Sequence, residues 1–93
     1  MERFIIKEKD KYGNIVELEG IATYHDELLN KDFIVYTDKT FDKNGKLKVY
    51  FSLYTKDDNN IKLVEVKTNE EKQIGLMLIK EIVKDLYNNN LGN

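Results

Sequence analysis

The side chains that could support nucleophilic catalysis are few in this chain. Such catalysis needs a serine, cysteine or threonine beside a base that a third group orients. The chain has no cysteine, and Ser52 is its single serine and His25 its single histidine. Ser52 lies inside a strand-like segment rather than on a strained turn, so these two residues do not predict a catalytic triad.

Metal and phosphate sites are also poorly supported. His25, Asp26 and Glu27 carry good ligand atoms, but three consecutive side chains cannot all face one ion, and a second histidine is missing. The segment 57–60 is rich in oxygen ligands but lacks the spacing, glycine and glutamate of a calcium loop. The glycines are too scattered for a phosphate-binding loop, standing at positions 13, 20, 45, 75 and 92. We therefore predict that the protein is not an enzyme and holds no metal or cofactor.

A two-residue period marks residues 46–55. Apolar or small residues alternate there with Lys48, Tyr50, Ser52 and Tyr54, as in a strand with one face on a core and the other toward water. Sheet-based proteins stack single-stranded nucleic acid on such tyrosines, with a neighbouring lysine on the phosphate. The same tyrosines also suit a protein interface or a stabilising cross-strand pair. All three roles stay open for Lys48, Tyr50 and Tyr54.

A helical period follows the last predicted strand. Thr68 and Glu71 have the spacing of a capping box, in which a hydroxyl and a carboxylate satisfy free amides of the first turn. Apolar residues then recur every three or four positions through about residue 87, and the main seam comprises Ile74, Leu78, Ile82 and Leu86. These signals predict a helix over about 69–87, followed by a frayed tail at 88–93.

The apolar residues of this helix cover more of its circumference than one sheet face requires. Leu76 and Tyr87 lie beyond the main seam, and Met77 falls among charged side chains. The surplus either fills a deep groove in the sheet or forms a surface for a partner or a second copy of the chain. The predicted partner-binding residues of the helix are therefore Leu76, Met77, Leu86 and Tyr87. Gly75 lies in the apolar arc, and its missing side chain predicts a close backbone approach to the sheet or to a partner.

Turn signals divide the rest of the chain into strands. Gly13 and the segment 42–45 are typical of tight turns, and Gly20 predicts a bulge within a long second strand. The strands are expected at about 3–9, 15–24, 32–37, 46–55 and 61–67. Residues 1–93 then form a single α+β domain, an antiparallel β-meander of about five strands with one C-terminal α-helix packed on one face.

The composition indicates the setting of the protein. The chain has 93 residues and no cysteine, so no disulfide holds the fold, which favours the cytoplasm for so small a domain. We identify no signal peptide and no apolar stretch of about 20 residues, so a membrane partner is not expected. The net charge of −2 does not favour nucleic acid. All but one of the basic residues are lysine and asparagine is abundant, which points to a bacterial source.

The order of the predicted elements is similar to that of a known family. The segments that carry the similarity are Phe4-Ile5-Ile6, Gly13-Asn14, Phe33-Ile34-Val35-Tyr36, Val49-Tyr50-Phe51 and 63–71. From about Phe4 to Val83 the chain thus resembles the small bacterial proteins of the "domain of unknown function 1292" family, which occur in low-GC Gram-positive bacteria. The resemblance implies the same order of strands and helix and a cytosolic protein. The family has no known catalytic residues, so the resemblance transfers no site.

These features together predict a small cytosolic, non-enzymatic interaction domain. It would bind a protein partner, or a second copy of itself, through the helix, with the tyrosine face as a second surface. The alternative is a single-stranded nucleic-acid binder that uses Tyr50, Tyr54 and Lys48. Salt distinguishes the two, because nucleic-acid affinity falls steeply between about 50 and 200 mM salt and apolar packing does not.

Overall fold

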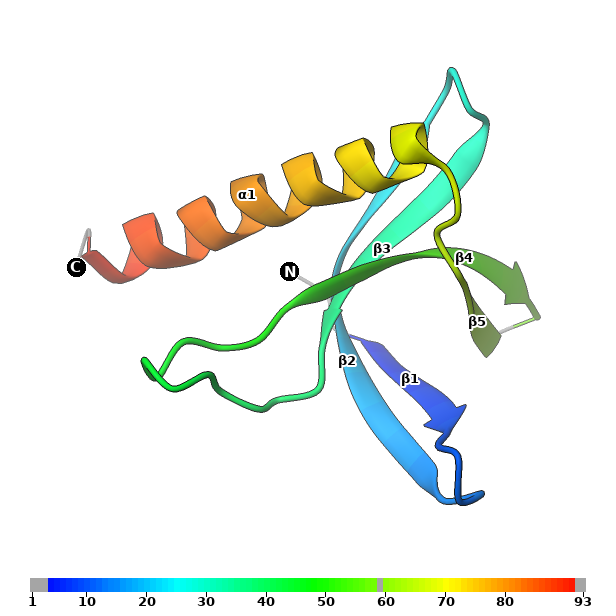
Figure 1. Ribbon diagram of the computed structural model, residues 1–93, viewed down its shortest axis with the longest axis horizontal. Helices are drawn as coiled ribbons and strands as arrows, with labels where there is room; N and C mark the ends of the chain where they lie inside the picture. The colour runs from blue at the N-terminus through cyan, green and yellow to red at the C-terminus, as the bar shows by residue number, and fades with distance from the viewer. Residues whose placement is uncertain (1–3, 59, 92–93) are drawn as a thin grey trace.

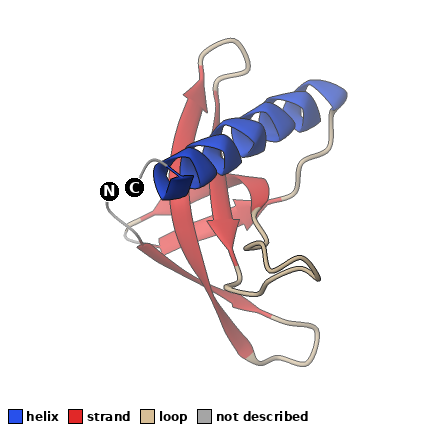
Figure 2. Ribbon diagram, turned by 90° about the vertical axis from the view of Figure 1, so that its left-hand side faces the viewer, coloured by secondary structure: helices blue, strands red, loops and turns tan. Residues whose placement is uncertain are grey.

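The chain folds into an antiparallel sheet with a helix on one face. The computed structural model of the protein describes residues 4–58 and 60–91. The elements in chain order are β1 (Phe4–Lys9), β2 (Ile15–Asp26), β3 (Lys31–Thr37), β4 (Tyr50–Asp57), β5 (Asn60–Val64) and α1 (Asn69–Leu91). Each strand pairs antiparallel with the next, and α1 crosses one face of the sheet (Figure 1, Figure 2). The predicted α+β meander with a C-terminal helix is confirmed.

The sheet curls where β2 is bent. The pairing of β2 with β3 shifts register between Gly20 and Ala22, and the extra residue of such a bulge bends the strand and increases its twist. In the curled sheet β1 comes near β5, although these edge strands do not pair with each other in the described part of the chain. Figure 1 shows both strands on the side of the sheet away from α1. The bulge predicted at Gly20 is confirmed, and the sheet is open.

The central strand β3 is buried on both faces. Phe33, Ile34 and Val35 are each at most 1% exposed, as expected for an apolar run without alternation. Side chains of a strand point alternately to the two faces, so Val35 and its cross-strand partner Phe51 lie under α1. Ile34 points the other way, toward the inside of the curled sheet. The core therefore has two layers, one on each face of β3.

Gly75 allows α1 to lie directly on β4. Gly75 is buried, and a Cβ atom built on it would lie 2.0 Å from ring atoms of Phe51. Carbon atoms in favourable contact are about 3.5–4.0 Å apart, so no larger residue fits without displacing the ring. The predicted close approach of the helix backbone is confirmed, and the neighbour is the sheet.

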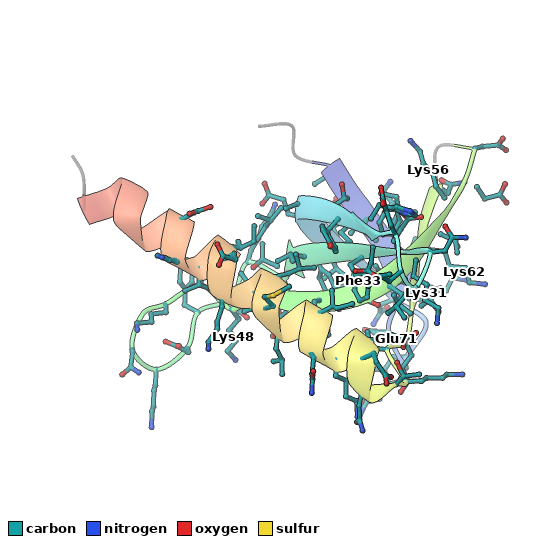
Figure 3. All side chains as sticks on the ribbon, turned by 90° about the horizontal axis from the view of Figure 1, so that it is seen from above. Lys31, Phe33, Lys48, Lys56, Lys62 and Glu71 are labelled. Carbon is teal, nitrogen blue, oxygen red and sulfur yellow. The ribbon has the colours of Figure 1, made fainter. Side chains whose placement is uncertain are left out.

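Thr68 and Glu71 form the predicted capping box at the start of α1. The Thr68 hydroxyl accepts a hydrogen bond from the Glu71 amide (3.1 Å), and Glu71 Oε1 accepts from the amides of Thr68 (3.1 Å) and Lys67 (2.9 Å). The other carboxylate oxygen accepts from the ammonium group of Lys31, at the start of β3 (Figure 3). The Lys31 hydrogen bond first, and the two amides next, lower the pKa of Glu71 from an ordinary 4.5 to about 2. One carboxylate, 2% exposed, thus attaches the helix to the sheet.

The strand predicted at 46–55 is wrong at its start, because β4 begins at Tyr50. The preceding strand ends at Thr37, whose hydroxyl donates to the Lys48 carbonyl oxygen (2.7 Å) in place of regular backbone pairing. Leu47 pairs with Phe41 in an isolated bridge. Lys48 therefore lies in the connection between β3 and β4. The alternation of residue types predicted extended backbone correctly, but it carried no information about a neighbouring strand.

Other boundaries also differ from the prediction. β2 continues to Asp26 and β5 ends at Val64, where 24 and 67 were expected. The Lys67 amide bonds into the helix cap, so it is not available to a strand. α1 continues to Leu91, so residues 88–91 are helical rather than frayed. Asparagine lowers helix propensity by less than about 1 kcal/mol per residue, which is too little to stop a helix by itself.

Thr37 supports the connection between β3 and β4. It is 2% exposed, and its hydroxyl donates to the Lys48 carbonyl and accepts from the Lys39 amide (3.0 Å). Valine has a similar shape without the hydroxyl, so Thr37→Val should lower the free energy of unfolding by about 1–3 kcal/mol in urea denaturation. Thr55→Val, at an exposed position of β4, is the control and should stay within about 0.5 kcal/mol. Wild-type stability in Thr37→Val would contradict this role.

Candidate functional site

Two open clefts flank the first turns of α1. The edge cleft, of about 570 Å³, lies between α1 and β4 and is lined by Tyr36, Phe51, Ser52, Leu63, Glu65, Val66, Lys72 and Leu76. The hairpin cleft, of about 450 Å³, lies between α1 and the turn that joins β2 to β3 and is lined by Asp26, Leu28, Leu29, Glu70, Gln73, Ile74 and Met77. Concave, mainly apolar sites with a few polar groups are typical of binding sites. The two clefts are therefore the candidate site.

Three large apolar side chains are exposed at these clefts. Leu76, in the edge cleft, is 58% exposed, and Met77 and Leu28, in the hairpin cleft, are 54% and 96% exposed. Successive helix residues are about 100° apart, so with Gly75 against the sheet, Leu76 and Met77 point away from it. The structure thus places these two predicted residues at the surface rather than in a groove of the sheet. The rest of the helix seam is partly buried, at Ile74, Leu78, Ile79, Ile82 and Val83.

Sequence reasoning did not single out Leu28. The turn that carries it is well defined, because Asp26 Oδ2 accepts a hydrogen bond from the Leu29 amide (2.9 Å) and Asn30 adopts a positive φ of 53°. This geometry directs Leu28 into solvent beside α1. Two adjacent leucines within an otherwise polar turn were the available signal.

The predicted tyrosine face is divided rather than continuous. Ser52, between the two tyrosines, is only 7% exposed, and its hydroxyl donates to the Val64 carbonyl oxygen (2.6 Å). Tyr54 is half-buried and lines a third cleft, of about 260 Å³, together with Lys31. Figure 3 shows Lys48 well apart from Lys31, beneath α1. β4 therefore does not present Lys48 and the tyrosines as one platform.

Negative charge lies beside Tyr50. Its ring stacks on Tyr36, with centroids 5.7 Å apart and planes inclined by 29°, and its hydroxyl donates to Asp38 Oδ2 (3.2 Å). Burial raises the pKa of Tyr36, and the nearby charges of Glu8 and Asp38 raise it further. Hydrogen bonds from Thr40 lower the pKa of Asp38, so this carboxylate is ionised at neutral pH. A phosphate placed here would meet carboxylates, which disfavours nucleic-acid binding.

Leu86 and Tyr87 were also predicted to bind a partner. Both belong to α1, but their side chains lie outside the described residues. Figure 1 shows the C-terminal half of α1 extending past the strands of the sheet. The role of these two residues stays a prediction.

His25 and Ser52 have separate hydrogen-bond partners. His25 Nδ1 lies 2.7 Å from Asp32 Oδ1 on the surface, and Ser52 donates to a backbone carbonyl. Within residues 4–58 and 60–91, no three histidine, cysteine or acidic side chains gather into a possible metal site. In the same ranges, α1 is not apolar enough over its length to cross a membrane. That the protein is not an enzyme stays a prediction.

A scan against protein-family models and searches of curated proteins and of solved structures return no match for this chain. The resemblance to the "domain of unknown function 1292" family therefore stays a prediction.

Proposed function

We propose that the protein is a non-enzymatic domain that binds another polypeptide through the first turns of α1. The observation that carries this proposal is the exposure of Leu76 and Met77, each more than half exposed in the wall of an open cleft. Exposed apolar side chains that gather beside concave sites are typical of interaction surfaces. Leu28, on the β2–β3 turn, adds a third anchor of the same kind.

Burial of these side chains would supply much of the binding energy. Complete burial of a leucine or methionine contributes about 1.5–3 kcal/mol, so a side chain that starts more than half exposed contributes about 1–2 kcal/mol when a partner covers it. Polar groups at the two clefts, including Lys72, Gln73 and Glu70, would orient the partner through hydrogen bonds at the rim.

The chemistry of the chain also bears on the setting and on the alternative function. The absence of cysteine suits a reducing compartment, so we infer a cytoplasmic protein. Single-stranded nucleic acid is the weaker candidate, because Asp38 and Glu8 lie where phosphates would be held beside Tyr50 and Tyr36. No observation favours it over a protein partner.

Affinity capture tests the proposal. The tagged full chain is incubated with a lysate of a low-GC Gram-positive bacterium, the source that the family resemblance implies, with and without nuclease. We expect wild-type protein to retain a nuclease-resistant protein, and a Leu76→Asp, Met77→Lys double variant to lose at least about 90% of it. Ile15→Asp, on the β1–β2 hairpin and 66% exposed in the wild type, is the matched control and should capture normally. Equal capture by the double variant would contradict the proposal.

Circular dichroism and sedimentation complete this experiment. Because both substituted side chains point into solvent, the double variant should keep the far-ultraviolet spectrum of the wild type. Sedimentation at several concentrations identifies a second copy of the chain as the partner, if the wild type dimerises and the double variant stays monomeric. Capture that nuclease abolishes would instead support the nucleic-acid alternative.

A further inference from the structure

The edge of β4 indicates what kind of polypeptide would bind. We propose that the edge cleft binds an extended segment of a partner protein, which adds to the sheet as a strand beside β4. This inference rests on the proposed function and specifies the chemistry of the partner. A second observation, independent of the exposed apolar side chains, supports it: β4 is incompletely paired.

One side of β4 is paired over only part of its length. β3 pairs with β4 from Tyr50 to Leu53, whereas β5 pairs with it from Leu53 to Asp57. After Val64 the chain leaves the sheet toward α1. The stretch Tyr50–Ser52 therefore has β3 on one side and no strand on the other within the described residues, and the edge cleft lies on that open side.

The register determines which backbone groups face the cleft. Asp57 and Asn60, separated by two residues, close the β4–β5 hairpin, and such a closing pair exchanges hydrogen bonds. Along an antiparallel ladder every second residue bonds to the same neighbour, so Thr55, Leu53 and Phe51 direct their N–H and C=O groups to the β5 side. Phe51 has no strand opposite it there. Its amide and carbonyl are thus positioned to pair with an incoming strand.

The walls of the cleft suit a chain in extended conformation. Side chains of a strand alternate between faces, and the cleft has walls from both faces of the sheet: Leu76 and Phe51 on the helix side, and Leu63 and Tyr36 on the other. An added strand would place successive side chains against these two walls in turn. Main-chain hydrogen bonds would then provide affinity, and the apolar walls would select apolar side chains.

A second copy of this chain fits the edge less well than a flexible segment does. The open stretch is three residues long, about 10 Å, and it lies inside a cleft rather than on a projecting rim. Its walls include Lys72 and Leu76 of α1 and Val66 of the connection to α1. A second folded sheet would have to bring its own helix into the same space, whereas a single extended segment has no such bulk.

Peptide selection tests the proposal directly. A display library of random linear dodecapeptides is selected on the immobilised full chain, and the strongest binders are synthesised with N-methyl groups on alternate backbone amides. In an added strand, one alternating set of amides bonds to β4 and the other faces away. We expect methylation of one set to weaken binding by about tenfold or more and methylation of the other set to leave it within about threefold. Equal tolerance of both sets would overturn the proposal.

Amide exchange locates the bound peptide. Hydrogen exchange of the Phe51 amide, followed by NMR, should slow by about tenfold or more on peptide binding, because the amide gains a hydrogen-bond acceptor. Leu76→Asp should weaken binding of the same peptides by about tenfold, and Ile15→Asp, on the β1–β2 hairpin and outside the cleft, is the matched control that should not. If the exchange rate of the Phe51 amide does not change when a peptide is bound, or if no peptide can be selected, the proposal that the partner adds a strand to β4 is overturned. Lysate capture that Met77→Lys abolishes would then still support the proposed function.

Discussion

Replacing Gly75 with alanine should destabilise the protein by about 2 kcal/mol, although alanine is the better helix former by about 1 kcal/mol. The added Cβ would lie 2.0 Å from Phe51 Cδ2 and Cε2 and 2.6 Å from Cγ. Because Cγ is close to the backbone, rotation of the ring cannot relieve the whole overlap. Either α1 moves away from β4 or Phe51 leaves its place, and both outcomes open the core. Urea denaturation of the variant measures the loss.

A second substitution separates crowding from any general effect on the helix. Phe51→Leu removes ring atoms at the point of contact, so the double variant Gly75→Ala, Phe51→Leu should be more stable than the sum of the two single changes predicts. Lys80→Ala, at an exposed position of the same helix, is the control and should leave stability within about 0.5 kcal/mol. A Gly75→Ala protein more stable than the wild type would show that the helix can rise from the sheet without cost.

Replacing Glu71 with glutamine should destabilise the protein at neutral pH and remove part of its acid sensitivity. The pKa of Glu71 is about 2 in the folded protein against an ordinary 4.5, first because Lys31 bonds to it and next because two backbone amides do. A carboxyl group with a lowered pKa stabilises the folded state fully above about pH 4.5. That stabilisation disappears as the pH falls from about 4.5 toward 2. Glutamine cannot carry the charge, so the variant should lose less stability over this window than the wild type.

Urea denaturation at several values between pH 7 and pH 2 provides the measurement. Glu70→Gln, at the neighbouring exposed position of the same helix turn, is the control and should keep the wild-type dependence on pH. Thr68→Ala, which removes the hydroxyl of the capping box alone, should cost about 1 kcal/mol, less than the loss in Glu71→Gln. The same pH dependence in Glu71→Gln and the wild type would contradict the role of the carboxylate.

The sequence predicted the features of the fold that depend on nearby residues. The capping box is set by two residues three positions apart, and the close approach of α1 is set by the missing side chain of Gly75. The partner of the buried Glu71 carboxylate was not predictable in this way, because Lys31 lies 40 residues earlier in the chain. The start of β4 was missed for a similar reason, since a hydroxyl on Thr37 holds Lys48 outside the strand.

The candidate site was only partly predictable. Leu76 and Met77 follow from the helical period, because residues outside the seam must face away from the sheet. The open side of Tyr50–Ser52 depends on where β5 stops pairing, which no local pattern encodes. The division of the tyrosine face likewise depends on the burial of Ser52 against Val64, which belongs to another strand.

The order of the elements also has a consequence during synthesis. Every strand pairs with the one made just before it, so each hairpin can form as soon as its second strand leaves the ribosome. The helix that covers Val35 and Phe51 is made after all five strands. A growing chain therefore passes through a stage in which the sheet is complete but its apolar face is uncovered. At that stage the chain is most prone to aggregate with other chains. Because α1 follows the five strands, the apolar face of the sheet stays open to other chains until α1 has been synthesised and packs on it.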